Sequence, residues 1–147
     1  MKFTPEIIEE YFIDLEKQLL NKARIKFEAS RKWAGSINFK SGIYLVFEKG
    51  KPCYVGESAN ISARMRDLTD TRNHTLRGKI GARYFSNQIG FEKASSSKKF
   101  NDSIEQQVND WMEQNVEVAF LEVNLGRREF EEWMIDRHNL VQKSKRK

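Results

Sequence analysis

A hairpin pattern near the middle of the chain constrains its fold more than any other feature. Two apolar stretches, Gly42–Phe47 and Cys53–Gly56, lie on either side of a turn at Lys49–Pro52. β-Branched and aromatic residues crowd both stretches, which is typical of paired strands. Because side chains alternate along a strand, Tyr44 lies on the face opposite its apolar neighbours. We therefore predict a hairpin in which Tyr44 and Tyr54 each carry a phenol near a strand end.

Length and composition fit one α/β domain. The chain has 147 residues, and 39% of them are hydrophobic, which suffices for one core. A single cysteine, Cys53, excludes an internal disulfide or a zinc cluster and is expected to be a small core residue. The sequence contains neither a long apolar run nor a signal-peptide pattern, so we expect a cytoplasmic protein without membrane contact.

Positive charge is concentrated in one part of the chain. The net charge is +5, whereas residues 64–99 contain nine Lys or Arg and three acidic residues, a local balance of +6. Clustered cations beside aromatic residues favour binding to a phosphate backbone, although a solvated surface gives the same pattern. The candidate nucleic-acid-binding residues are Arg66, Arg72, Arg77, Lys79, Arg83, Lys98 and Lys99.

The first 40 residues are expected to form a helix and a connecting loop packed on the same domain. Thr4 and Pro5 are typical of a helix start, and apolar residues then recur at helical spacing to about residue 27. The segment Arg31–Ser36 is predicted as a loop, in which Trp33 either contacts nucleic acid or closes the core.

Residues 41–140 are expected to form the main domain. After the hairpin, Ser58 is predicted to cap a helix that runs to about Asp70. Its inward side chains are expected to be Ile61, Met65 and Leu68. Further helices are predicted at 76–87, 102–113 and 127–138, with a strand at 116–123, a polar loop at 94–99 and a disordered basic tail at 141–147. The predicted fold class is α/β, with a small mixed or antiparallel central sheet flanked by helices and an N-terminal amphipathic helix.

Two charged residues fall on or near the apolar faces of their predicted helices. At 100° per residue, Arg64 lies at the margin of its apolar stripe, and Glu131 lies within the arc bounded by Met134 and Ile135. A carboxylate at such a position needs a cation or a metal ion nearby, and a structural salt bridge satisfies it equally well. Together with the two phenols, this set is suitable for phosphodiester chemistry, in which an arginine binds the phosphate and a metal ion stabilises the leaving group.

These motifs resemble the GIY-YIG endonuclease family, which includes homing, restriction and excision-repair nucleases. Gly42-Ile43-Tyr44 corresponds to the first motif and Tyr54-Val55-Gly56 to the second. Arg64 follows Tyr54 at the family's usual distance, and Glu131 stands four residues before Ile135, as the family's metal-binding glutamate does.

The resemblance implies a role for each matching residue. Glu131 would hold a divalent ion, usually Mg²⁺ with Mn²⁺ as a substitute, and Arg64 would bind the scissile phosphate. Tyr44 or Tyr54 would act as the base, and we favour Tyr44. Many family members have a His or Tyr downstream of the arginine, so His74 is a further candidate, with a purely structural role as the alternative.

Two positions depart from the family pattern. The family often has a lysine three residues after the second tyrosine, where this chain has Glu57, and Lys79 is a candidate replacement. Asn139 comes earlier than the family's asparagine, so its correspondence is weak.

The sequence thus predicts a metal-dependent DNA endonuclease, with a catalytically inactive nucleic-acid-binding module of the same fold as the alternative. DNA is the expected partner, and a homodimer or a partner protein that supplies specificity is compatible with the sequence.

Overall fold

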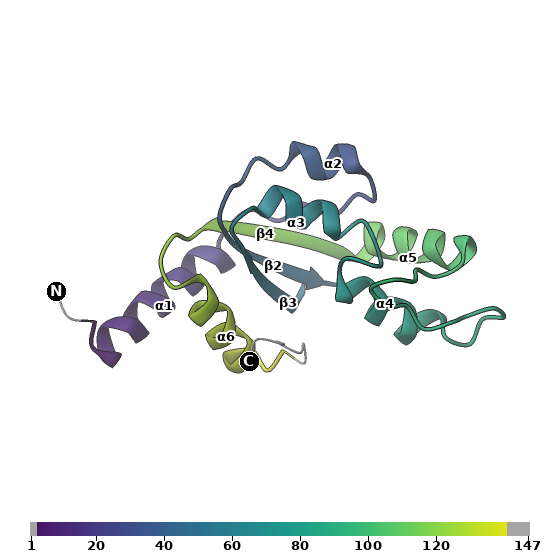
Figure 1. The fold of residues 1–147 in the computed structure, drawn as a ribbon. Helices are drawn as coiled ribbons and strands as arrows, with labels where there is room; N and C mark the ends of the chain where they lie inside the picture. The colour runs from purple at the N-terminus through teal and green to yellow at the C-terminus, as the bar shows by residue number, and fades with distance from the viewer. Residues whose placement is uncertain (1–2, 141–147) are drawn as a thin grey trace.

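The computed structural model describes residues 3–140 and is built around a four-stranded antiparallel sheet with the strand order β1-β4-β2-β3 (Figure 1). The strands are β1 (Ile25–Lys26), β2 (Gly42–Glu48), β3 (Lys51–Ser58) and β4 (Val116–Glu122). Strand β2 pairs with both β3 and β4. The predicted hairpin is therefore correct, and its first strand lies inside the sheet with neighbours on both sides.

Helices cover both faces of the sheet (Figure 1). One core cluster joins α2, α3, α4 and α5 to one face, and a second cluster joins α1 and α6 to the other. The helices are α1 (Pro5–Leu20), α2 (Arg31–Ser36), α3 (Ile61–Asp67), α4 (Thr75–Phe85), α5 (Asp102–Asn115) and α6 (Arg127–Arg137). The predicted α/β fold class with an N-terminal helix is confirmed.

The alternation of β2 divides its side chains between the two clusters. Tyr44 and Val46 belong to the cluster of α2–α5, whereas Ile43, Leu45 and Phe47 belong to the cluster of α1 and α6. All five side chains are essentially inaccessible to solvent. The prediction that Tyr44 points away from its apolar neighbours is therefore correct.

Close packing between strands requires the glycine at the start of β2. A Cβ atom at Gly42 would lie 2.2 Å from the backbone oxygen of Leu121 in β4. Any side chain at this position would force the two strands apart, because a backbone atom cannot move aside as a flexible side chain can.

The end of α1 differs from the prediction. Thr4 caps the helix as expected and accepts a hydrogen bond from the N–H of Ile7 at 3.2 Å. The helix ends at Leu20, however, and not near residue 27. Residues Ile25 and Lys26 instead form β1 and pair with the edge of β4. Backbone pairing at a sheet edge has outweighed the local helical pattern.

The segment predicted as a loop before the hairpin is the short helix α2. The Ser30 side chain caps it by accepting a hydrogen bond from the N–H of Trp33 at 3.0 Å. The Trp33 ring is buried and packs edge-on against Phe27, with ring centroids 5.2 Å apart. Of the two predicted roles for Trp33, closing the core is the one that the structure supports.

The cap of α3 also differs from the prediction, because Asn60 and not Ser58 occupies that position. The predicted inward residues Ile61, Met65 and Leu68 are all fully buried. Helices α4, α5 and α6 and strand β4 lie where they were expected, with ends shifted by at most two residues. The predicted disordered tail at 141–147 lies outside the described residues. Within residues 3–140, no helix has the length and apolarity needed to cross a membrane.

Arg77 was predicted to bind nucleic acid at the surface, and this prediction is wrong. Its side chain is only 1% exposed and joins α4 to α5. The guanidinium donates to Glu105 at 3.0 Å, to Asn109 at 2.7 Å and to the hydroxyl of Thr71 at 3.0 Å. Arg77 lies on the inward stripe of α4 beside Leu76 and is therefore a core residue, inaccessible to nucleic acid.

We expect Arg77→Ala to lower the free energy of unfolding by about 3–5 kcal/mol, because the substitution leaves a partly buried carboxylate without its cation. Urea denaturation measures this change. The matched control is Arg66→Ala on exposed α3 surface, which we expect to change stability by less than about 0.5 kcal/mol. Equal stability losses in the two variants would contradict the structural role of Arg77.

Candidate active site

The Tyr44 ring lies across the neighbouring strand at a glycine. Tyr44 pairs with Gly56 in the register of β2 and β3. A Cβ atom at Gly56 would lie 2.3 Å from Cζ of Tyr44 and 2.4 Å from its hydroxyl oxygen. The glycine of the second motif therefore provides the space that the Tyr44 phenol occupies.

His74 holds the hydroxyl of Tyr44 from the side of α4. It is the N-cap of that helix, and its Nδ1 faces the backbone N–H of Leu76 at 3.2 Å. Its Nε2 lies 3.0 Å from the Tyr44 oxygen. Since Nδ1 accepts a hydrogen bond, the proton of the neutral imidazole resides on Nε2 and is donated to Tyr44.

The surroundings of His74 keep it neutral. Burial lowers the pKa of His74 well below its usual range, and the positive charges of Arg64, Arg77 and Lys79 lower it further. A histidine that is neutral and whose Nδ1 is occupied acts as a hydrogen-bond donor to the phenol. Protonation of His74 would break its bond to the backbone of Leu76.

Tyr54 completes an aromatic group with Tyr44 and His74. Its ring centroid lies 6.1 Å from that of Tyr44 and 4.9 Å from that of His74. Tyr44 is 1% exposed, whereas Tyr54 is partly accessible. The two tyrosines are thus on the same face of the hairpin, and Tyr54 is the one nearer to solvent.

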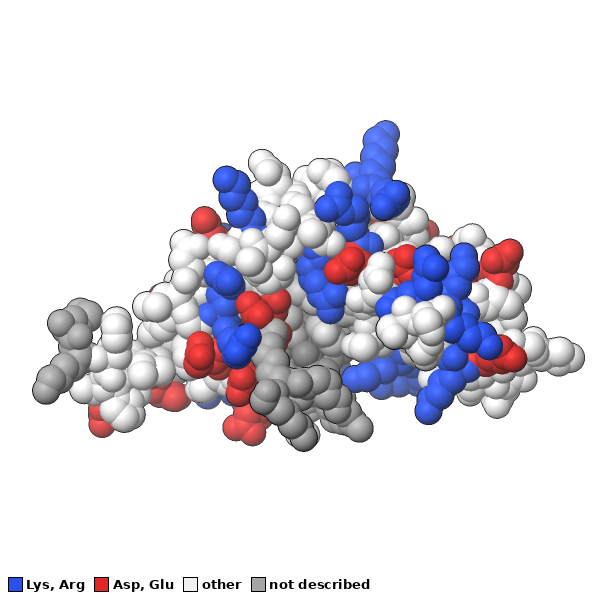
Figure 2. Space-filling view, in the orientation of Figure 1, with Lys and Arg blue, Asp and Glu red and all other residues white. Residues whose placement is uncertain are grey.

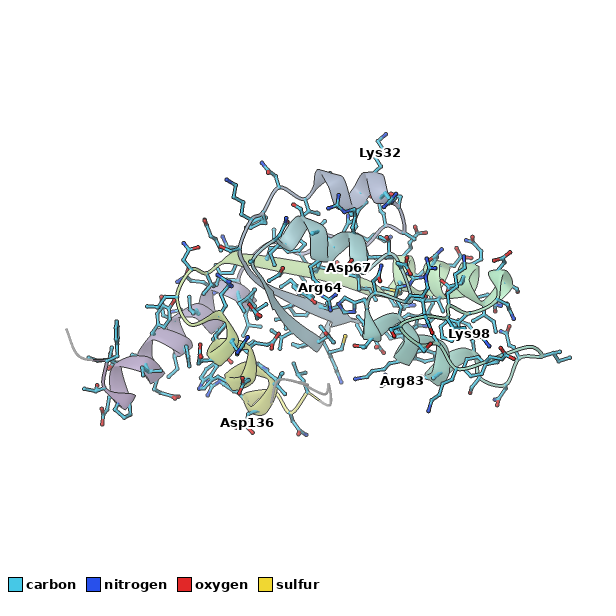
Figure 3. All side chains as sticks on the ribbon, viewed as in Figure 1. Lys32, Arg64, Asp67, Arg83, Lys98 and Asp136 are labelled. Atoms are coloured by element: carbon cyan, nitrogen blue, oxygen red, sulfur yellow. The ribbon has the colours of Figure 1, made fainter. Side chains whose placement is uncertain are left out.

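Arg64 approaches the same phenol from α3. Arg64 and Asp67 lie next to each other in the middle of the molecule (Figure 3). The Nη1 atom of Arg64 donates to Asp67 at 3.1 Å and to the carbonyl of Asn73 at 3.0 Å, and these two acceptors fix the guanidinium. Burial acts to lower the pKa of Arg64, but the phenol of Tyr44 and the carboxylate of Asp67 outweigh burial and raise it above its usual range. Arg64 is therefore a permanent cation beside Tyr44.

Opposing influences act on the Tyr44 hydroxyl. Burial raises the pKa of Tyr44 well above its usual value, and the neighbouring Tyr54 raises it further. The charge of Arg64 and a hydrogen bond from its guanidinium act in the opposite direction. The net result is a protonated phenol whose oxygen is surrounded by two donors.

Glu131 reaches the opposite side of the same point on β3. It lies on α6 and is 6% exposed, and its Oε2 accepts a hydrogen bond from the backbone N–H of Glu57 at 2.9 Å. Glu57 directly follows Gly56, on which the Tyr44 ring packs. The carboxylate and the phenol therefore meet at two consecutive residues of one strand, and Glu131 is on the buried arc of its helix as predicted.

This donor set is compatible with a weakly ligated hard cation. No group of three or more His, Cys, Asp or Glu side chains in residues 3–140 is arranged to hold a metal ion. Mg²⁺ is commonly bound through one or two carboxylates and otherwise by water and phosphate oxygens. A single carboxylate such as Glu131 fits that manner of binding, and an enclosed zinc site does not fit.

Comparison with protein families gives one match. The model of the GIY-YIG catalytic domain matches residues 24–144, which is most of the chain. The chain belongs to the GIY-YIG family. Membership indicates nuclease activity in general. Comparisons with curated proteins and with solved structures give no significant match.

One of the two positions at which this GIY-YIG domain departs from the family pattern, Glu57, forms an ion pair within the domain. Glu57 pairs with Arg127 at the start of α6, with 3.3 Å between Nε and Oε1. Arg127 was not among the predicted residues, and no local spacing links it to Glu57. Asp67, which positions Arg64, was also missed, although its place three residues after Arg64 on one helix is a detectable signal.

Lys79 and Asn139 lie close to Tyr54, the first residue of the second GIY-YIG motif. Both line a pocket of about 230 Å³ that also includes Tyr54. Asn139 has a left-handed backbone with φ of 52°. Both residues therefore remain candidates for contact with a substrate that reaches Tyr54.

The other predicted nucleic-acid-binding residues are exposed, unlike Arg77. Basic side chains lie over α2, the middle of the molecule and α4, whereas acidic ones are frequent over α1 and α6 (Figure 2). Several of the cations already have acidic partners, since Arg72 pairs with Asp70 and Arg83 with Glu48. The exposed members of the predicted set are Arg66, Arg72, Lys79, Arg83, Lys98 and Lys99.

We expect Gly56→Ala to reduce nuclease activity at least about 100-fold, because the new methyl group displaces the Tyr44 phenol from His74 and Arg64. The control is Gly35→Ala, where the added Cβ has no heavy atom within 4 Å. Cleavage rates and circular dichroism spectra of both variants separate displacement of the ring from unfolding. Full activity of a folded Gly56→Ala protein would contradict this geometry.

Proposed function

We propose that this GIY-YIG protein is a divalent-metal-dependent DNA endonuclease that hydrolyses phosphodiester bonds by attack of water. The convergence of Tyr44, Arg64, His74 and Glu131 around Gly56 carries the proposal. These residues come from one strand, β2, and from three helices, α3, α4 and α6, and they supply an acid–base group, a phosphate ligand and a metal ligand. A module that only binds nucleic acid needs neither the acid–base group nor the metal ligand.

Tyr44 is proposed to accept the proton of the attacking water. The donors on its oxygen, His74 and Arg64, stabilise the phenolate more than the phenol, which offsets part of the cost of ionising a buried group. His74 is then a positioning residue that holds the phenol. Tyr54, which lies beside both rings, is proposed to orient the water or the substrate.

Arg64 is proposed to bind the scissile phosphate. Asp67 and the carbonyl of Asn73 fix its Nη1, so the planar group is oriented before substrate arrives. A preorganised guanidinium stabilises the charge that develops on the phosphate oxygens during hydrolysis.

Glu131 is proposed to hold Mg²⁺, or Mn²⁺ as a substitute, together with water and phosphate oxygens. When bound there, such an ion supplies positive charge for the leaving oxygen. The Glu57 N–H, which donates to the Glu131 carboxylate, orients the carboxylate toward the residue that follows Gly56, on which the Tyr44 ring packs.

Cleavage of supercoiled plasmid tests the function directly. We expect nicking or linearisation with Mg²⁺ or Mn²⁺ and none with chelator, and we expect Glu131→Gln and Arg64→Ala each to reduce the rate at least about 100-fold. The matched controls are Glu132→Gln and Arg128→Ala, which alter exposed residues of α6 outside the cluster at Tyr44. Binding without cleavage under every metal condition would instead favour an inactive nucleic-acid-binding module.

The pH dependence identifies the base. Only the deprotonated form of a base accepts a proton, and burial raises the pKa of Tyr44 above its usual value of about 10. We therefore expect the cleavage rate to rise about tenfold per pH unit up to pH 9 without a plateau. Tyr44→Phe should lose both the activity and this slope, whereas Tyr54→Phe should keep the slope. A plateau below pH 8 in the wild-type protein would exclude Tyr44 as the base.

A further inference from the structure

Two hollows adjoin the loop that connects α3 to α4. The first, the arginine hollow, has a volume of about 470 Å³ and is lined by Arg31, Arg66 and Arg72 among others. The second, the lysine hollow, has a volume of about 480 Å³ and is lined by Lys79 and Lys93 among others. Arg31 and Lys93 were not among the residues predicted to bind nucleic acid.

The arginine hollow contains cations that are available to a ligand. Its two acidic residues are already engaged, since Asp70 binds Arg72 at 3.0 Å and Asp67 binds Arg64 at 3.1 Å. Within the described part of the chain, Arg31 and Arg66 make neither an ion pair nor a side-chain hydrogen bond. Two guanidinium groups from α2 and α3 thus face one hollow, and planar guanidinium donors suit phosphate oxygens.

The walls of the lysine hollow contain no acidic residue. The cations Lys79, Lys93 and Arg72 are accompanied by the hydroxyl groups of Thr75 and Ser95. Cations combined with hydroxyl donors, without carboxylates, favour an anion over a cation.

The loop between the hollows carries residues of the proposed active site. Arg72 and Asn73 line both hollows. The carbonyl of Asn73 accepts a hydrogen bond from Arg64, and His74 lines the lysine hollow while it holds Tyr44. A ligand that occupies both hollows therefore passes the loop residue whose carbonyl holds Arg64, the residue proposed to bind the scissile phosphate.

We propose that one nucleic-acid strand lies in both hollows, with Arg31 and Arg66 binding phosphates on one side of the scissile bond and Lys79 and Lys93 binding phosphates on the other. This inference rests on the proposed nuclease function for the position of the scissile bond. The chain thereby recognises a continuous backbone of several nucleotides and not an isolated phosphodiester.

Salt-dependent binding tests the strand site independently of cleavage. In a Glu131→Gln background, a 20-nucleotide single strand and its duplex are the probes. Removing two phosphate contacts with Arg66→Ala and Lys93→Ala should reduce the slope of log affinity against log salt by about 1.4 for the single strand or about 1.8 for the duplex. The control is Lys17→Ala with Lys22→Ala, which removes equal charge outside both hollows. A reduction with either probe supports the site, and equal slopes in the two double variants overturn it.

A second pair of variants tests the lysine hollow by changing one position in two ways. Gly78 lines the hollow, and a Cβ atom there would meet only Cβ of Ala94 at 3.9 Å. Gly78→Ala should therefore bind nucleic acid as the wild type does, whereas Gly78→Glu places a negative charge in the hollow and should weaken binding at least about tenfold. Equal affinity of the two variants would overturn the assignment.

The experiments can disprove the strand site and the nuclease function independently of each other. If the wild-type protein cuts DNA and the hollow variants keep the wild-type salt slope, the strand site is wrong and the nuclease proposal stands. If the wild-type protein does not cut but the hollow variants lose affinity and slope, the strand site stands and the nuclease proposal fails.

Discussion

The contact between the Tyr44 ring and the bare α-carbon of Gly56 is the constraint on which the site depends. It forces the phenol over β3 and toward the start of α4, where His74 can reach its oxygen. The same point of β3 presents the Glu57 N–H to Glu131 on the other side. Because β2 lies inside the sheet, the ring has little freedom to move, so the groups from α3, α4 and α6 assemble around a fixed centre.

Arg77 and Arg64 lie on helices that cover the same face of the sheet, and their different burial gives them different roles. The Arg77 guanidinium binds Glu105, Asn109 and Thr71 inside the core, and burial lowers its pKa. Arg64 is less buried, and its guanidinium binds Asp67 and the carbonyl of Asn73 through Nη1 and also donates to Tyr44. The buried guanidinium of Arg77 holds helices together, whereas the partly accessible guanidinium of Arg64 is oriented toward a ligand.

The sequence predicted the hairpin, the opposite faces of Tyr44 and its neighbours, and the buried position of Glu131, because strand and helix periodicity determine them locally. It missed α2 and the early end of α1, where the edge of β4 and the core around Trp33 decide the conformation. Arg77 was misplaced because charge counts do not reveal which side of a helix faces a buried acidic partner. The hydrogen bond between His74 and Tyr44 joins residues thirty positions apart, and their spacing in the sequence does not predict that they meet.

The arrangement of the site depends on the hydrogen bond from His74 Nε2 to the Tyr44 oxygen, which long-range ¹H–¹⁵N NMR of the histidine side chains can detect. We expect His74 to be neutral and protonated at Nε2 from pH 8 down to below pH 6, since burial lowers its pKa. Tyr44→Phe should shift the Nε2 resonance of His74 and leave that of His138, the other histidine of the chain, unchanged. A proton on Nδ1, or titration of His74 near its ordinary pKa of about 6.5, would show that this hydrogen bond is absent.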